Sequence, residues 1–229
     1  PVDKDGAPVI KYRHKKLEDI YMQITAAALW LNTVFAGFDQ SVTLLVHRLY
    51  TEAGFFFTPF FEFISFLGKD GIILVLLSLA LTLYRPSRRF GTAMLFAITI
   101  GALLTNVFLK TAIARPRPYA DESSIFYQLW LLVGQNMESD KSFPSGHTTA
   151  AFATMTAVFF MGDKRYSWTA FIFAILMGIS RIYLVVHFPS DVLGGIIVGF
   201  TAGCLGALIA CRLPAKWYET DILKKKRGA

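Results

Sequence analysis

Long runs that are nearly free of charged residues divide the chain into segments of similar length. Crossing the hydrocarbon core of a bilayer takes about 20 residues of helix, within a range of roughly 17 to 25. Five runs fit this length, and a sixth fits when the aromatic stretch before it, residues 55–67, extends its outer end. The six runs cover residues 20–38, 71–84, 90–109, 143–161, 167–186 and 192–211. The pattern predicts an all-α integral membrane protein with six transmembrane helices.

A shorter segment between the first two runs has a different pattern. Residues 39–50, with the sequence DQSVTLLVHRLY, place Val42, Leu45, Val46 and Leu49 at helical spacing. An amphipathic helix of this kind is typical of the membrane–water interface, where its apolar face is buried and its polar face is hydrated. We expect an interfacial helix at the outer face of the membrane. It either borders the path of a lipid to a site or simply packs there.

The rest of the chain is polar. Residues 1–19 precede the first run, and this long basic stretch does not resemble a signal peptide. Residues 213–229 form a basic tail. We therefore predict one membrane domain, residues 20–212, between two cytoplasmic segments. Composition agrees, because hydrophobic residues make up 54% of the 229 residues and charged residues only 17%, which is unusual for a soluble domain.

Basic residues are distributed unequally between the two sides of the predicted membrane domain. With six spans, 16 of the 23 lysines and arginines fall on one side. Cytoplasmic loops collect Lys and Arg, so this side, with both termini, is predicted to face the cytoplasm at the plasma membrane. The net charge of +7 then indicates attraction to anionic lipids. It does not indicate nucleic-acid binding, because no basic region alternates with aromatic residues as in a nucleic-acid groove.

Seven basic residues remain on the other side, and three of them lie at or inside the ends of apolar runs: Lys110, Arg117 and Arg181. An ionisable residue at membrane depth costs about 2.5–3.5 kcal/mol on insertion scales, so it marks a functional candidate. The alternative is snorkelling, in which a long basic side chain near a helix end reaches water. Snorkelling explains Lys110 equally well. It explains Arg181 less well, because five apolar residues separate that arginine from His187.

The segment SFPSGH, residues 142–147, has the features of a helix start that binds an anion. Pro144 suits the first turn, where its missing N–H leaves no partner unsatisfied. Ser145 and Gly146 then present backbone N–H groups at the positive end of the helix dipole, and Gly146 permits close approach. His147 lies on the same turn. A plain helix cap would explain this segment alone, but the three cations fall at the same predicted face of the membrane.

A second histidine lies at that face beside a carboxylate. Asp191 follows His187 by four residues, and Pro189 between them starts the sixth predicted helix. A carboxylate at this spacing can accept one ring N–H, which fixes the tautomer and leaves the other nitrogen free to attack. A polar pair that only caps a helix is the alternative. Two histidines, one carboxylate and three cations at one depth favour a catalytic site.

Three blocks of sequence, KTAIARPRP, PSGH and SRIYLVVHFPSD, together resemble the signature motifs of the type 2 phosphatidic acid phosphatases. This family is the membrane branch of the superfamily that also contains the vanadium haloperoxidases. Its pattern is Lys, six residues, Arg-Pro; then Pro-Ser-Gly-His; then Ser-Arg, five residues, His, three residues, Asp. Every specified position and both internal spacings match. By helix layout the resemblance covers about residues 64–211.

The resemblance implies a phosphatase of lipid phosphates that needs no metal or other cofactor. It implies that His187 is a nucleophile that forms a phosphohistidine, that Asp191 orients it, and that His147 acts as general acid and then general base. The residue types agree, because phosphoryl transfer depends on charge stabilisation and the arginine fork suits phosphate. The sequence has no cluster of metal-binding residues. The phosphoryl oxygens would be bound by Lys110, Arg117, Arg181 and the backbone donors of Ser145 and Gly146.

Other classes of function predict other patterns. A transporter or channel would place charges near the middle of the bilayer and show repeat symmetry. A lipid-binding module without activity would not need both histidines and Asp191. A lipid phosphotransferase would use the same residues, and only phosphate release in the absence of an acceptor separates it from a phosphatase.

Among lipid phosphates we favour undecaprenyl diphosphate, because the predicted site faces outward, where this carrier must be recycled. Phosphatidylglycerol phosphate, phosphatidic acid and lipid A phosphates also offer a terminal phosphate on a lipid, and the residues do not separate them. The expected partners are the lipid substrate and the bilayer. Neither nucleic acid nor an obligate protein partner is expected.

Overall fold

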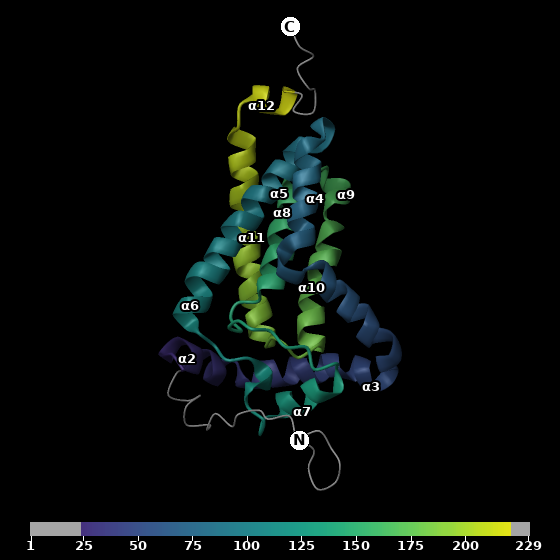
Figure 1. The fold of residues 1–229 in the computed structure, drawn as a ribbon, viewed down its shortest axis with the longest axis vertical. Coiled ribbons are helices and arrows are strands. Elements are labelled where there is room, and N and C mark those ends of the chain that lie inside the picture. Colours follow the sequence, from purple (N-terminus) through teal and green to yellow (C-terminus); the bar gives the residue numbers. More distant parts are fainter. Residues whose placement is uncertain (1–23, 221–229) are drawn as a thin grey trace, which may run out of the picture.

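The computed structural model describes residues 24–220, which form an all-helical bundle with further helices across its ends (Figure 1). Its long axis is built by α4 (Ile72–Leu83), α5 (Arg88–Ala102), α8 (Gly146–Met161), α10 (Ala170–Tyr183) and α11 (Pro189–Arg212). One end, called the α7 end, carries α2 (Ala26–Val34), the first half of α3 (Ala36–Leu67) and α7 (Ile125–Leu132). The opposite end, called the α12 end, carries α9 (Lys164–Ser167) and α12 (Ala215–Glu219). The connections contain η1 (Lys69–Gly71), η2 (Arg85–Ser87), the π-helical η3 (Leu103–Leu109), α6 (Lys110–Ile113) and η4 (Pro118–Ala120).

Four helical segments among the described residues are long and apolar enough to cross a membrane. They are Ala36–Leu83, Arg85–Ala120, Lys164–Tyr183 and Pro189–Arg212, and each contains most or all of one predicted run. Large apolar side chains cover the outside of these segments; Leu76, Phe108 and Ile197 are 60%, 62% and 67% exposed. A surface of this kind is suited to lipid rather than water. The protein is an all-α integral membrane protein.

The fourth predicted run corresponds to α8, which has only 16 residues. This helix lies in the middle of the bundle and packs against α5, α10 and α11. Most of its side chains between Thr148 and Ala157 are buried. α8 is thus enclosed by other helices along its length, and its N-terminus lies at the α7 end (Figure 1).

The first predicted run, residues 20–38, differs from the structure. Residues 20–23 lie outside the described range, and the rest divides into α2 and the start of α3. Phe35 separates the two helices with φ −97° and ψ 3°. The nine residues of α2 extend about 13 Å, whereas the hydrocarbon core is about 30 Å thick. From residue 24 to residue 38, therefore, no single helix spans the bilayer, and α2 instead lies across the α7 end (Figure 1).

The predicted amphipathic segment, residues 39–50, is helical and forms the first half of α3, which bends at Ala53 (φ −153°, ψ 50°). The face of this half that turns toward the bundle carries both polar and apolar side chains. Asp39 and His47 are buried, and Val46 and Leu49 of the predicted apolar face pack against a buried hydrophobic cluster, whereas Leu45 is 60% exposed. The segment therefore directs polar side chains, together with part of its apolar face, toward the bundle at the α7 end.

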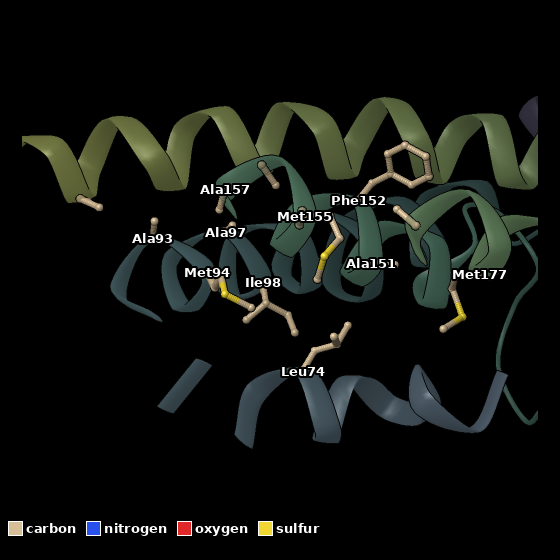
Figure 2. Close-up of a cluster of buried hydrophobic side chains, with 14 of the residues drawn as sticks. Leu74, Ala93, Met94, Ala97, Ile98, Ala151, Phe152, Met155, Ala157 and Met177 are labelled. Atoms are coloured by element: carbon tan, nitrogen blue, oxygen red, sulfur yellow. The ribbon is translucent and has the colours of Figure 1, made fainter. Parts of the chain in front are cut away.

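Small residues bring α5, α8 and α11 close together in the core (Figure 2). A Cβ atom added at Gly206 of α11 would lie 2.5 Å from the backbone nitrogen of Ala97 in α5. One added at Gly199 would lie 2.6 Å from the backbone oxygen of Thr149 in α8. Close approach through small residues is a general way in which membrane helices associate. Here it fixes α11 against α8, and both helices begin at the α7 end.

Seven of the 14 described lysines and arginines lie at the α12 end, and the other seven are those that the sequence assigns to the opposite side, so the described residues alone do not show the predicted inequality. Arg88 is fully buried at the α12 end and donates to the carbonyl oxygens of Thr82 (2.8 Å) and Trp217 (3.0 Å), so it ties α12 to the bundle. The predicted basic segments in residues 1–19 and 221–229 lie outside the described range. The described basic residues of this end are Arg85, Arg88, Arg89, Lys164, Arg165, Arg212 and Lys216.

Candidate active site

The signature residues converge at the α7 end, although they belong to separate helices and turns. A cavity of about 570 Å³ lies there and is lined by Lys110, Arg117, Gly146, His147 and His187, among others. Both predicted catalytic histidines therefore face one space. In chain order the residues are Lys110 at the start of α6, Arg117 before η4, His147 in the first turn of α8, Arg181 in the last turn of α10, His187 before α11, and Asp191 in the first turn of α11.

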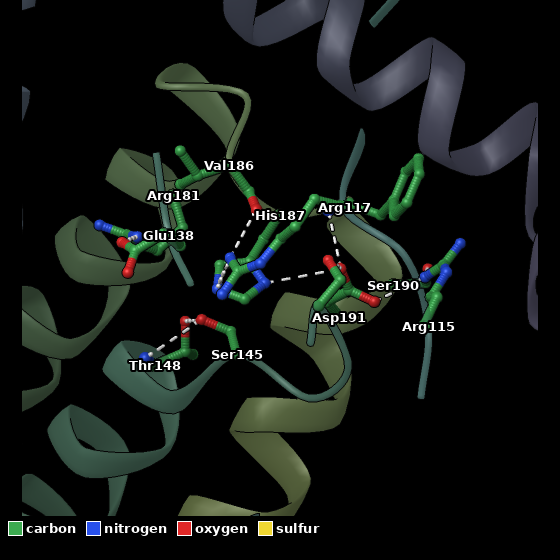
Figure 3. Close-up of polar contacts among 12 residues, drawn as sticks. Arg115, Arg117, Glu138, Ser145, Thr148, Arg181, Val186, His187, Ser190 and Asp191 are labelled. Atoms are coloured by element: carbon green, nitrogen blue, oxygen red, sulfur yellow. Dashed lines mark hydrogen bonds and ion pairs between the residues drawn. The ribbon is translucent and has the colours of Figure 1, made fainter. Parts of the chain in front are cut away.

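His187 is buried and its two ring nitrogens have different surroundings (Figure 3). Nε2 lies 2.9 Å from Nη1 of Arg117. A guanidinium group can only donate, so Nε2 accepts this hydrogen bond and the ring proton of neutral His187 is on Nδ1. Nδ1 lies 3.6 Å from Oδ2 of Asp191, an ion-pair distance too long for a hydrogen bond. The geometry directs the lone pair of Nε2 toward the cations.

Burial lowers the pKa of His187 well below its ordinary value, and the positive charges of Arg117, Arg181 and Lys110 lower it further. The charge of Asp140 opposes this shift but does not cancel it. A histidine in this environment is neutral near pH 7, which is the protonation state that a nucleophile needs.

Asp191 has no exposed surface, and both of its carboxylate oxygens accept hydrogen bonds. Oδ1 accepts from Nη1 of Arg115 at 2.6 Å. Oδ2 accepts from Oγ of Ser142 at 2.5 Å and from the backbone N–H of Phe188 at 2.9 Å. The second of these bonds caps the first turn of α11. Asp191 is therefore held on both sides, with Oδ2 directed at His187.

The three predicted phosphate-binding cations are buried and paired with carboxylates of the segment before α8. Asp140 forms ion pairs with both Lys110 and Arg117. Glu138 pairs with Arg181, which also donates to Oγ of Ser65. These carboxylate oxygens contact the same cations that phosphoryl oxygens would contact. No sequence pattern indicates this pairing, because Glu138 and Asp140 stand in a polar loop without a motif.

The pKa of Asp140 results from opposing effects. Burial alone would raise it. The hydrogen bond and charge of Lys110, together with the charge of Arg117, outweigh burial, and the pKa is lowered. Asp140 is therefore ionised at neutral pH. Its negative charge partly compensates the positive charges of Lys110 and Arg117.

The start of α8 differs in one respect from the expected anion site. The backbone N–H of Ser145 donates to the backbone oxygen of Asp191 at 3.0 Å, so it is already engaged. The Ser145 side chain accepts from the backbone N–H of Thr148 and caps the helix. Gly146 does face the cations, since a Cβ built there would lie 3.6 Å from Nζ of Lys110. Of the two predicted backbone donors, only that of Gly146 is placed beside the cavity.

A second polar cluster adjoins the site, and sequence reasoning did not single it out. Arg115 is 1% exposed and donates to Asn32, Asp39, Ser190 and Asp191 at 2.6 to 2.9 Å. The available signal was weak: Arg115 was one of the seven basic residues on the non-cytoplasmic side, next to Arg117. Asp39 lies far away in the sequence and belongs to no motif.

Groups that could hold a metal do not occur in the part of the chain that the structure describes, where no three His, Cys, Asp or Glu side chains are suitably grouped. Cys204 and Cys211 are free thiols on α11.

Comparison with known families agrees with the geometry of the site. A sequence model of the PAP2 superfamily matches residues 90–213, more than half of the chain, and this range contains every predicted site residue. The chain belongs to the PAP2 superfamily. The likeness stated from the three sequence motifs is thereby confirmed.

Relatives of this PAP2 protein include named phosphatases. Undecaprenyl-diphosphatase BcrC of Bacillus subtilis is 34% identical over 106 residues, which cover 46% of this chain and 51% of that protein. Lipid A 1-phosphatase of Rhizobium johnstonii is 32% identical over 122 residues, covering 53% and 48%. The chain spans about half the length of these relatives. A crystal structure of a PAP2-type phosphatidylglycerolphosphate phosphatase from Bacillus subtilis has the same fold, with a TM-score of 0.52 at 24% identity over 83% of this chain and 98% of that chain.

Proposed function

We propose that this PAP2 protein hydrolyses the terminal phosphate of a membrane lipid phosphate or diphosphate through a phosphohistidine on His187. The observation that carries the proposal is the position of the His187 ring. Its Nε2 lone pair is directed at Arg117 beside the cavity, while its Nδ1 faces the buried carboxylate of Asp191. This arrangement supplies a neutral nucleophile, with the negative charge of Asp191 on its Nδ1 side and the positive charge of Arg117 on its Nε2 side.

In the first step, Nε2 of His187 attacks the phosphorus atom and the bond from phosphorus to the leaving oxygen breaks. Lys110, Arg117 and Arg181 stabilise the charge on the phosphoryl oxygens. The imidazole ring becomes positively charged as the P–N bond forms, and Asp191 stabilises that charge from the Nδ1 side. His147 faces the same cavity and donates a proton to the leaving oxygen.

In the second step, His147 takes a proton from a water molecule, which attacks the phosphorus atom. The P–N bond breaks, inorganic phosphate leaves, and His187 returns to its neutral form. One residue thus serves as acid and then as base. No step needs a metal ion, because the three cations supply the positive charge that transferred phosphoryl groups require.

A lipid substrate is supported by the shape of the cavity. Its polar part contains Lys110 and His147, and its wall continues along the apolar residues Val75, Ile98 and Leu103. Leu103 is 49% exposed on the outside of the bundle. The cavity therefore joins the cations to the lipid-facing surface, which suits a phosphate that is attached to a hydrocarbon chain.

Among lipids, we propose undecaprenyl diphosphate as the substrate, supported by the similarity to undecaprenyl-diphosphatase BcrC. Phosphatidylglycerol phosphate, phosphatidic acid and lipid A phosphates are the alternatives, and the similarity to a lipid A 1-phosphatase favours the last of these. A phosphotransferase that uses the same site would pass the phosphoryl group to an acceptor other than water.

We also propose an orientation in the plasma membrane. The support is the full sequence, in which 16 of the 23 lysines and arginines fall on the side of the α12 end when six spans are counted, so this end would face the cytoplasm and the site at the α7 end would face outward. A count of six spans, with both termini cytoplasmic, depends on residues before Ile24, which lie outside the described range. That part of the topology stays a prediction from charge and hydropathy.

The proposal is tested by phosphate release from the purified protein in detergent with a panel of the four lipid classes. We expect release without any added acceptor, fastest from undecaprenyl diphosphate. We also expect competitive inhibition by vanadate and no effect of chelators. His187→Ala should abolish release from every lipid. Activity that disappears with a chelator, returns with a divalent cation and ignores vanadate would contradict the mechanism.

A further inference from the structure

The guanidinium group of Arg115 lies between two buried carboxylates. Nη1 donates to Oδ1 of Asp191 at 2.6 Å, and Nη2 donates to Oδ2 of Asp39 at 2.9 Å. The three side chains are 0–2% exposed, so they interact in surroundings from which water is largely excluded. In such surroundings a charge that loses its partner is strongly disfavoured. The two carboxylates and the arginine must therefore be treated as one unit.

Asp39 is fixed by α11 as well as by Arg115. Its Oδ1 accepts from the backbone N–H of Ser190 at 2.8 Å, and its Oδ2 accepts from Oγ of Ser190 at 2.8 Å. The same serine hydroxyl lies 2.7 Å from Nη1 of Arg115. Ser190 directly precedes Asp191, so α3 is tied to the turn of α11 that carries the catalytic carboxylate.

The amino-terminal helices are thus joined to the site. Arg115 also donates from Nε to Oδ1 of Asn32 at 2.8 Å, and Asn32 lies on α2. Asn32 and Asp39 both precede residues 90–213, the range that matches the PAP2 superfamily. Contacts that fix Arg115 and Ser190, the neighbours of Asp191, therefore come from a part of the chain that the family match does not cover.

We propose that Asp39 and Arg115 are positioning residues for Asp191 in the proposed phosphatase reaction. Arg115 holds the Oδ1 side of Asp191, which leaves Oδ2 directed at His187 (Figure 3). Asp39 shares the positive charge of Arg115, so that Asp191 is not neutralised by a one-to-one pair. More of its negative charge then stabilises the imidazole ring when His187 becomes positively charged.

This inference rests on the proposed function and predicts an effect on turnover rather than on substrate binding. Neither residue lines the cavity that holds the cations, whereas Lys110, Arg117 and His147 do. An interaction that matters only when charge develops in the transition state lowers kcat and leaves KM nearly unchanged when it is removed. A residue that merely supports the fold would change stability without this selective loss.

The test uses Asp39→Asn and Arg115→Lys in the full chain, with phosphate release and vanadate inhibition as readouts. Asp39→Asn keeps the shape but removes the charge. Arg115→Lys keeps the charge but cannot contact two carboxylates in a fixed plane. For each we expect kcat to fall by about tenfold or more, equal to about 1.4 kcal/mol. KM should stay within about twofold, because the cations are untouched. Vanadate, which takes on the five-coordinate geometry of phosphoryl transfer, should inhibit more weakly, in parallel with kcat.

Glu52→Gln is the matched control, because it makes the same change of carboxylate to amide on an exposed residue of α3. It should behave like the wild type. A KM within about twofold of the wild-type value shows that a variant is folded, and either variant alone suffices for the test. Wild-type kcat in a folded Asp39→Asn or Arg115→Lys protein would overturn this inference and leave the proposed function standing. A wild-type protein without phosphatase activity would instead overturn the proposed function.

Discussion

In the proposed mechanism, Arg117 contacts both the nucleophile and the phosphate. Its Nη1 contacts Nε2 of His187 and the backbone oxygen of Val186, while the other side of the guanidinium group pairs with Asp140. A phosphoryl group that displaced Asp140 would meet the arginine and the histidine lone pair together. The planar, multidentate form of Arg allows this, and a lysine at the same position would not.

The lowered pKa of His187 predicts the acid side of the pH profile. The nucleophile must be neutral, so kcat/KM falls as pH decreases through the pKa of His187 in the free enzyme. Burial and the charges of Arg117, Arg181 and Lys110 place that pKa well below 6.5. On the acid side we expect kcat/KM to fall only well below pH 6.5, after correction for titration of the substrate phosphate, measured separately by phosphorus NMR. The alkaline side depends on His147, the proposed general acid, whose pKa is also lowered by burial and by the charge of Arg181. An acid-side half-maximal rate at or above pH 6.5 would show that the nucleophile is not held neutral.

At the scale of single residues, the sequence predicts the site residues that stand in local motifs. It does not predict which residues they contact. Lys110, His147 and His187 were found because each stands in a block whose spacing is specific. Asp39 was missed because its partner Ser190 lies 151 positions later, and no local pattern connects them. The engagement of the Ser145 N–H by Asp191 was missed for the same reason, since it depends on how α8 and α11 meet.

At the scale of single elements, hydropathy predicts the apolar runs but not whether each run forms one helix that crosses the bilayer. The run over residues 20–38 looked like a span, yet the break at Phe35 divides its described part into two helices. The bend of α3 at Ala53 likewise has no marker such as proline at that position. The first half of α3 is held across the bundle by Asp39, which contacts Arg115 and α11, and by Val46 and Leu49, which pack against a buried hydrophobic cluster.

The packing of α11 predicts a clear difference between two glycine substitutions. A Cβ at Gly206 would meet backbone atoms of α5 at 2.5 Å, whereas a Cβ at Gly37 of α3 would meet nothing within 4 Å. Gly206→Ala should therefore destabilise the protein by about 1–3 kcal/mol, because backbone cannot move aside as a side chain can. Thermal unfolding in detergent measures this as a lower apparent Tm. Gly37→Ala is the control and should not lower Tm; equal Tm values for both variants would contradict the proposed packing.

The whole molecule places its candidate site at one end of the helical bundle. α12 lies at one end, and α2 and α7 lie at the other (Figure 1), where the cavity with its two histidines is found. α8 and α11 connect the ends and are held together by small residues. A site at the end of a bundle is close to the headgroup region of a bilayer, where the phosphate of a lipid would lie.

The proposed orientation predicts which cysteines a membrane-impermeant reagent can reach in intact cells. Cys204 and Cys211 are first replaced by Ala, and single cysteines are then introduced at Glu122 near α7 and at Lys216 in α12. The residue at position 122 should be labelled in intact cells, and the residue at position 216 only after the cells are opened. The reverse pattern would place the site at the cytoplasmic face of the membrane. It would also remove the argument for undecaprenyl diphosphate, which rests on the recycling of this carrier at the outer face.

The most direct test of the central claim is to trap the phosphoenzyme. The purified protein is mixed with a lipid substrate that carries a radioactive terminal phosphate, stopped within the first turnover, and separated under alkaline conditions, which preserve phosphohistidine. We predict label on the wild-type protein that acid removes, and none on His187→Ala. His147→Ala should still acquire label when the leaving group is acidic, because protonation then matters less. Label that persists on His187→Ala, or turnover of the wild type without any trapped label, would contradict the account.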